Sequence, residues 1–157
     1  MNRLIGRHKE QAKLQTCMNS ERSEFVVVYG RRRIGKTFLV RRFFEDRYAF
    51  SFVGKHEMAK DLQLQEFAKA LQRYSGSAFV PVLKNWTEAF DGLQKLLASV
   101  ETPGKKVVFF DEMPWMDTPK SDFVMALENF WNGWANMRDD ILFVACVSAT
   151  SWMVDKL

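Results

Sequence analysis

The 157-residue sequence has few of the residues that mark disulfide-bonded, metal-bound or membrane proteins. Its two cysteines, Cys17 and Cys146, lie far apart without a C-x-x-C pair, and its two histidines do not cluster with them. These absences exclude a disulfide framework and a Cys/His metal centre. The first residues lack the apolar run of a signal peptide, and the longest apolar run, Ile141–Val147, is too short to span a bilayer. We therefore expect a cytoplasmic chain without a membrane partner.

The composition is that of a globular protein, with 47% hydrophobic and 27% charged residues. A length of 157 residues suits one domain with a real core, and we assign residues 1–157 to a single domain. The formal charge of +4 comes mainly from a local cluster made of residues 31–33 and of Arg41 and Arg42. Such a cluster favours a polyanion. Nucleotide phosphate is the nearest candidate, and nucleic acid remains the alternative.

Apolar patterns alternate along the chain between buried strands and amphipathic helices. Residues 25–29 and 107–110 are continuous β-branched and aromatic runs, which predict strands buried on both faces. Further strands are expected at 48–53 and 141–147, and helices after Gly6 and at 35–46, 57–74, 85–97 and 123–137. Alternation of this kind predicts an α/β fold with a parallel sheet between two helical layers. Ligands of such sheets bind at the carboxyl ends of the strands, where Gly30, Asp111 and Ser148 are expected.

Residues 30–37 match G-x-x-x-x-G-K-[ST], the phosphate-binding P-loop, between a predicted strand and a predicted helix. Glycines let the backbone turn around an anion, and the helix N-terminus adds unpaired N–H groups. Lys36 is expected to contact the β- and γ-phosphates, and the Thr37 hydroxyl to bind Mg²⁺. The three arginines either attract the anion or are solvated. The expected nucleotide-binding residues are Gly30, Arg31, Arg32, Arg33, Ile34, Gly35, Lys36, Thr37 and Phe38.

Two acidic residues and a serine follow the other two strands expected at this edge. Asp111 and Glu112 come directly after the run at 107–110, in the pattern of a Walker B element. One aspartate suffices for Mg²⁺, so Asp111 is the predicted metal ligand, and Glu112 is the predicted general base toward water. Ser148 either contacts the γ-phosphate or the attacking water, with Thr150 in reserve, or simply caps the next turn.

These motifs together resemble the prokaryotic/archaeal ATPase family, which belongs to the STAND group near the AAA+ ATPases. The resemblance rests on Leu4-Ile5-Gly6-Arg7, the P-loop, Asp111-Glu112-Met113-Pro114-Trp115 and the segment 148–153. It implies a P-loop core sheet in the order 5-1-4-3-2, and ATP with Mg²⁺ as ligands of a slow, switch-like ATP hydrolase. It also implies that Ile5, Gly6 and Arg7 lie near the adenine.

The same resemblance implies that residues 1–157 form an incomplete core domain. The fifth strand, a helical lid and a C-terminal effector domain would lie beyond Leu157, and this fragment alone is expected to bind nucleotide weakly and hydrolyse it poorly. Two other functions stay open. A nucleic-acid-associated regulator would use nucleotide mainly for structure, and a small-molecule phosphotransferase would need an acceptor pocket and a mobile arginine lid. Arg138, predicted late in a helix, is either an arginine finger or an ordinary helix-end charge.

Overall fold

The computed structural model of the chain describes residues 8–29 and 35–147. Strands and helices alternate along these residues, as the apolar patterns predict. Two short 3-10 helices, η1 and η2, interrupt this alternation. In chain order the elements are α2 (His8–Asn19), β1 (Glu24–Tyr29), α3 (Lys36–Phe44), β2 (Phe50–Val53), α4 (Lys60–Ser75), α5 (Trp86–Ser99), β3 (Lys106–Asp111), η1 (Met113–Met116), α6 (Phe123–Gly133), η2 (Ala135–Met137) and β4 (Ile141–Val147).

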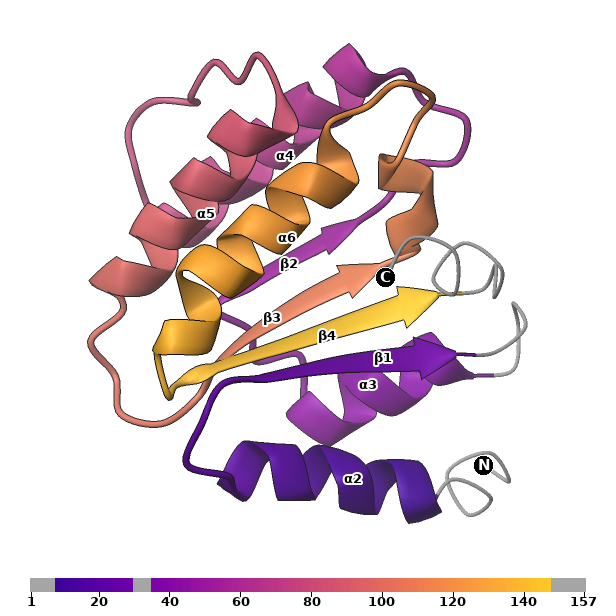
Figure 1. The fold of residues 1–157 in the computed structure, drawn as a ribbon, viewed down its shortest axis with the longest axis vertical. Helices are drawn as coiled ribbons and strands as arrows, with labels where there is room; N and C mark the ends of the chain where they lie inside the picture. Colours follow the sequence, from indigo (N-terminus) through magenta and orange to yellow (C-terminus); the bar gives the residue numbers. More distant parts are fainter. Residues whose placement is uncertain (1–7, 30–34, 148–157) are drawn as a thin grey trace.

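The four strands in the described part of the chain form one parallel sheet in the order β1-β4-β3-β2 (Figure 1). This order agrees with positions 1-4-3-2 of the expected P-loop core and confirms the predicted α/β fold. Strands β3 and β4 are flanked on both sides, and all their residues are buried. All four arrows in Figure 1 point toward the same edge of the sheet, so the strand ends that carry the predicted site residues face one side of the molecule.

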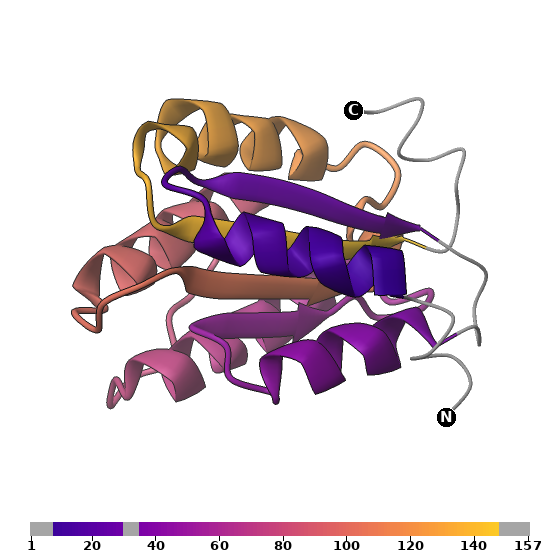
Figure 2. The ribbon, with the colours of Figure 1, turned by 90° about the horizontal axis from the view of Figure 1, so that it is seen from below.

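Helices cover both faces of the sheet and produce two separate core clusters (Figures 1 and 2). On one face, α2 and α3 pack against alternate residues of the strands, including Val26, Phe109 and Val144. On the other face, α4, α5 and α6 pack against the residues between them, including Phe110 and Phe143. The alternation follows from strand geometry, since successive side chains point to opposite faces of a sheet.

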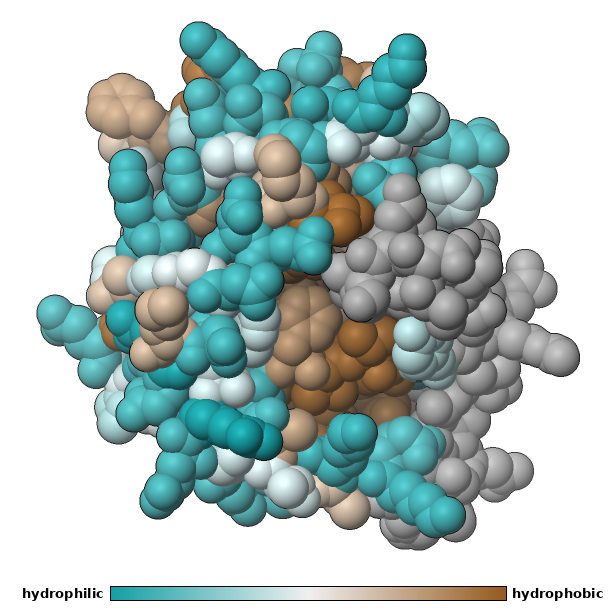
Figure 3. Space-filling model, in the orientation of Figure 1, coloured by the Kyte–Doolittle hydropathy of each residue, from teal (hydrophilic) through white to brown (hydrophobic). Residues whose placement is uncertain are grey.

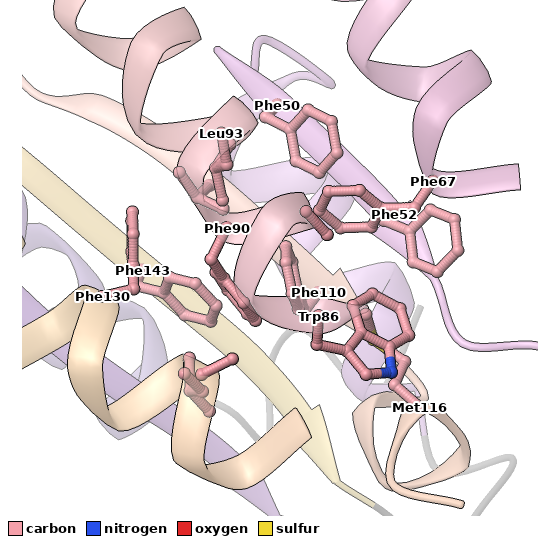
Figure 4. Close-up of a cluster of buried hydrophobic side chains, with 14 of the residues drawn as sticks. Phe50, Phe52, Phe67, Trp86, Phe90, Leu93, Phe110, Met116, Phe130 and Phe143 are labelled. Atoms are coloured by element: carbon pink, nitrogen blue, oxygen red, sulfur yellow. The ribbon is translucent and has the colours of Figure 1, made fainter. Parts of the chain in front are cut away.

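Aromatic rings fill the larger of the two clusters, and Phe67 of α4 lies among them (Figure 4). Its side chain has no exposed surface. Its ring centroid lies 5.0 Å from that of Phe50, 5.1 Å from that of Phe52 and 5.4 Å from that of Trp86. Ring pairs at such distances add to the free energy gained by burying their area. This packing joins α4 and α5 to strand β2.

One apolar surface of β1 is left partly open. Phe25 and Val27 are half-buried, whereas Val26 and Val28 on the other face are buried. A shallow groove of about 200 Å³ is lined by Phe25 and by residues of α6 that include Leu127 and Trp131. Figure 3 shows apolar surface over β1 beside α6. The prediction of a strand buried on both faces is therefore wrong for β1. Among the described strands β1 stands at the edge of the sheet, and α6 covers it only in part.

The helix predicted at 123–137 is shorter than its apolar pattern suggests. Helix α6 ends at Gly133, and Trp134 leaves helical geometry with φ −138° and ψ −63° before η2. Glycine costs about 1 kcal/mol relative to alanine in a helix, which favours a break here. The Trp134 ring packs on Phe130 and lies 5.0 Å from the guanidinium of Arg138. None of the helices within the described ranges is long and apolar enough to cross a membrane.

We expect Phe67→Ala to lower the free energy of unfolding by about 3–5 kcal/mol, because it leaves a cavity among aromatic rings. Phe79→Ala is the matched control, since the Phe79 side chain is 80% exposed. It should change the free energy by less than about 0.5 kcal/mol. Urea unfolding followed by circular dichroism measures both variants, and equal losses would contradict this assignment of the core.

Candidate functional site

The start of α3 and the end of β3 meet at the carboxyl edge of the sheet. Gly35 precedes α3 with φ 83°, a left-handed conformation that suits glycine, and its carbonyl accepts the first helical hydrogen bond, from Leu39 N at 2.8 Å. The helix therefore begins where the P-loop motif predicts. The N–H groups of its first turn have no partner within the helix and favour an anion at this point.

Lys36, the first residue of α3, is nearly buried, with only 4% of its surface exposed. Lysine is rarely buried to this extent unless it has a charged partner. The positive charge of Lys36 favours the ionised form of the neighbouring carboxylate of Asp111. A cation is therefore held at the helix N-terminus, beside the only negative side chain that the described residues bury at this edge.

The two predicted metal ligands are in direct contact, although 74 residues separate them in the sequence. The Thr37 hydroxyl lies 2.9 Å from Oδ2 and 3.1 Å from Oδ1 of Asp111. Asp111 is 7% exposed and belongs to β3, between β4 and β2. A hydroxyl and one carboxylate are oxygen donors of the kind that Mg²⁺ takes, with water and phosphate completing its shell. The donor set therefore fits the predicted ion. A different kind of metal site, built from three or more His, Cys, Asp or Glu side chains, is absent from residues 8–29 and 35–147.

Burial is the largest influence on the pKa of Asp111 and raises it above its ordinary value. Hydrogen bonds from the Thr37 hydroxyl and the Glu112 backbone N–H oppose this shift, because they stabilise the charged form. A cation bound beside this carboxylate would oppose the raised pKa in the same way. The carboxylate at this edge of the sheet is therefore stabilised in its ionised form when a cation binds beside it.

Glu112 occupies an unusual backbone position directly after β3. Its φ of 52° and ψ of 40° are left-handed, which is uncommon for a residue with a side chain. Its N–H donates to Asp111 Oδ1 at 2.9 Å, and its carbonyl accepts from Trp115 N at 3.1 Å as η1 begins. The side chain is half-buried. The geometry thus places the predicted base one residue beyond the predicted metal ligand, at the head of a tight turn.

The sequence model of an ATPase domain found predominantly in Archaea matches residues 4–157. The chain belongs to this ATPase family. An uncharacterized ATP-binding protein of Methanocaldococcus jannaschii is 35% identical over 43 residues, which are 27% of this chain and 73% of that protein. The Walker-type ATPase of Pyrococcus abyssi has the same fold, with a TM-score of 0.66 and 17% identity over 96% of this chain. This chain spans 47% of the length of that structure.

Several predicted nucleotide contacts of this ATPase domain lie outside the described residues, and they stay predictions. They are Ile5, Gly6, Arg7, Gly30, Arg31, Arg32, Arg33, Ile34 and Ser148. Phe38 is described. It is half-buried in the first turn of α3, with the Arg42 guanidinium 5.7 Å from its ring centroid.

Arg138 lies at the wrong end of the sheet to act as an arginine finger on this chain's own site. Its guanidinium makes two hydrogen bonds of 2.8 Å to the carboxylate of Asp140, which precedes β4. The amino end of β4 lies at the edge of the sheet opposite to Asp111, because all four strands are parallel. In this ATPase domain Arg138 is therefore part of an ion pair far from the candidate site.

Sequence reasoning missed two residues that shape the turn at Glu112. Gly54 N donates to the Asp111 carbonyl at 2.8 Å, and a Cβ added to Gly54 would lie 2.2 Å from the Glu112 carbonyl oxygen. Gln63 of α4 is fully buried and donates to the Trp115 carbonyl. A signal for Gln63 was present, because this polar residue stands one turn before Phe67 on the buried face of the helix.

We expect Asp111→Asn and Asp140→Asn to shift the pH dependence of stability in opposite directions. The pKa of Asp111 is raised in the folded state, so its contribution is present below about pH 4 and is lost as the pH rises through the raised pKa. Relative to the wild type, Asp111→Asn should therefore gain stability toward neutral pH. Hydrogen bonding to Arg138 lowers the pKa of Asp140 to about 2, so its contribution is present at neutral pH and Asp140→Asn should lose stability there.

Urea unfolding of both variants and of the wild type from about pH 3 to pH 7, without magnesium, measures these differences. Differences from the wild type that change with the same sign in both variants would contradict the assigned environments of the two carboxylates.

Proposed function

We propose that this chain binds ATP with Mg²⁺ and hydrolyses it to ADP and phosphate, and that this hydrolysis is coupled to a conformational switch. The contact between Thr37 and Asp111 is the observation that carries the proposal. It joins the P-loop motif to the carboxyl end of β3 and gathers two oxygen donors beside a buried lysine. Membership of the ATPase family and the likeness to an ATP-binding protein support the same function.

The chain's own residues supply most of what phosphate binding needs. The N–H groups at the start of α3 and the Lys36 ammonium face the negative charge of the phosphates, and electrostatic stabilisation of this kind dominates phosphoryl transfer. Thr37 and Asp111 would hold Mg²⁺, which when bound neutralises charge on the β- and γ-phosphates. Backbone groups of the loop at residues 30–34 would complete the cradle.

Glu112 is the residue that we assign to the hydrolytic step. Its carboxylate would accept a proton from a water molecule whose oxygen attacks the γ-phosphorus. The bond between the γ-phosphorus and the bridging oxygen of ADP then breaks, and the electron pair stays on that oxygen. Ser148, the next residue in the sequence after β4, would orient the water or the γ-phosphate.

This chain spans 47% of the length of the Pyrococcus structure, so we state the activity of a whole protein only as part of this proposal. We propose that a lid and an effector domain respond to the state of the γ-phosphate, and that the protein acts in the cytoplasm. Closure of a lid would exclude water and complete the site.

We expect Lys36→Ala to weaken binding of magnesium-ATP by at least about tenfold, because it removes the buried cation beside the phosphates. Lys69→Ala is the control, since Lys69 forms an exposed pair with Glu66 on α4. Isothermal titration calorimetry with ATP and Mg²⁺ measures both variants. Equal affinities for Lys36→Ala and the wild type would refute the phosphate site.

We expect Glu112→Gln to bind ATP within about threefold of the wild type and to lower its rate of hydrolysis by about 10²–10⁴, because an amide cannot accept the proton. The control Glu66→Gln removes a carboxylate from the surface of α4. Phosphate release under single-turnover conditions measures the rates. ADP formation that requires an added hydroxyl or phosphate acceptor would favour a phosphotransferase instead.

A further inference from the structure

Gln63 is a fully buried amide whose two ends hold two different loops of the candidate site. Its Nε2 donates to the Trp115 carbonyl at 2.6 Å and to the Met58 carbonyl at 3.1 Å. Its Oε1 accepts from the Lys55 backbone N–H at 3.0 Å. A buried amide is costly unless it is paired, and these three bonds engage both of its ends.

The donor end of Gln63 holds the turn that carries Glu112. Trp115 lies in η1, and its N–H donates to the Glu112 carbonyl, so the residue that Gln63 binds is also bonded to Glu112. Met113 and Met116 are fully buried in the same turn. The left-handed conformation of Glu112 is unfavourable for a residue with a side chain and persists only where the surroundings enforce it. The bond to the Trp115 carbonyl is one of the contacts that enforce it.

The acceptor end of Gln63 holds the chain that follows β2. Lys55 stands directly after Gly54, whose N–H donates to the Asp111 carbonyl at 2.8 Å. A side chain at Gly54 would collide with the Glu112 carbonyl, because a Cβ there would lie 2.2 Å from this oxygen. The chain after β2 therefore lies directly against the backbone of Glu112, and η1 is hydrogen-bonded to the same residue through Trp115 N. Gln63 spans both segments from α4.

We propose that Gln63 is a positioning residue for Glu112. Its amide fixes η1 against the loop after β2 and so fixes the backbone that carries the Glu112 carboxylate. This inference rests on the proposed role of Glu112 in hydrolysis. An apolar residue of similar length would fill the same space, so the role belongs to the hydrogen bonds of the amide. It predicts an effect on the chemical step rather than on nucleotide binding, because Gln63 holds neither Lys36 nor Thr37.

The test measures ATP hydrolysis by Gln63→Met and Gln63→Glu. Methionine removes all three hydrogen bonds at similar length, whereas glutamate keeps the acceptor for Lys55 N–H and sets a carboxylate oxygen against the Trp115 carbonyl. Both variants should lower kcat by about 10- to 100-fold with KM for ATP within about threefold, since small misplacements of a catalytic group have effects of this size. Gln72→Met is the matched control. It lies on the same helix and donates to the Ser77 carbonyl at 2.8 Å, away from the site, so its kcat should equal that of the wild type.

A second pair of variants reaches the same turn without changing Gln63. Gly54→Ala forces a Cβ against the Glu112 carbonyl, and should also lower kcat more than it changes KM. Gly133→Ala is its control, because a Cβ there meets no atom within 4 Å. This pair tests whether kcat depends on the backbone position of Glu112, which is the premise of the positioning role. An unchanged kcat in a folded Gly54→Ala would overturn that role even if the Gln63 variants fail to fold.

Hydrogen exchange of the backbone amides at residues 112–117 gives a readout that does not depend on hydrolysis. Faster exchange there in Gln63→Met than in Gln72→Met supports the positioning role, and equal exchange overturns it. If the wild type hydrolyses ATP and both Gln63→Met and Gly54→Ala keep its kcat, the positioning role is wrong while the proposed function stands. If the folded wild type releases no phosphate, the proposed function fails, and the exchange rates still decide whether Gln63 holds the turn.

Discussion

The candidate site depends on a carboxylate that the fold buries at the end of an interior strand. Asp111 lies in β3 between β4 and β2, so strand order alone removes it from most of the solvent. A buried charge is costly unless hydrogen bonds or an opposite charge compensate it. Here the hydroxyl of Thr37, the N–H of Glu112 and the charge of Lys36 act together on this one group. The P-loop helix and the turn before η1 therefore each supply a group that compensates the burial of Asp111.

The opposite edge of the sheet is built to hold the fold together. Asp140 forms ion pairs with Arg138 and Lys106. The Ser23 hydroxyl, just before β1, donates to the Arg138 carbonyl and accepts from Ile141 N at the start of β4. The Lys105 ammonium donates to the Cys17 carbonyl near the end of α2. At this edge these charged and polar groups therefore pair with other groups of the protein. At the Asp111 edge the charge of Lys36 acts on the buried carboxylate of Asp111, and the first N–H groups of α3 have no partner within the helix. The interactions that join β1 to β4 thus lie at the end of the strands opposite to the candidate site.

The sequence predicted what depends on local pattern and missed what depends on contacts between distant residues. The run at 107–110 and the acidic pair after it placed β3 and its end correctly. The helix expected at 85–97 is α5, which Asn85 caps by accepting from Glu88 N. The contact of Gly54 with Glu112 and the bonds of Gln63 join segments that only the folded sheet brings together. The break after Gly133 was missed because the apolar spacing continues through Trp134 and Met137, while the local backbone follows the packing of Trp134.

The two halves of the site rest on different layers of the protein. Helix α3 packs through Val40 and Phe44 into the cluster on one face, and η1 packs through Met113 and Met116 into the cluster on the other. The direct side-chain bond across the sheet edge runs from Thr37 to Asp111. A ligand that competes for these two oxygens acts at the junction between the layers. Because packed cores shift between discrete arrangements rather than deform continuously, such a junction is a suitable place for nucleotide state to change the relation between α3 and η1.

Gln63 and Phe67 stand one turn apart on α4, so the aromatic core that holds Phe67 also holds the turn that carries Glu112.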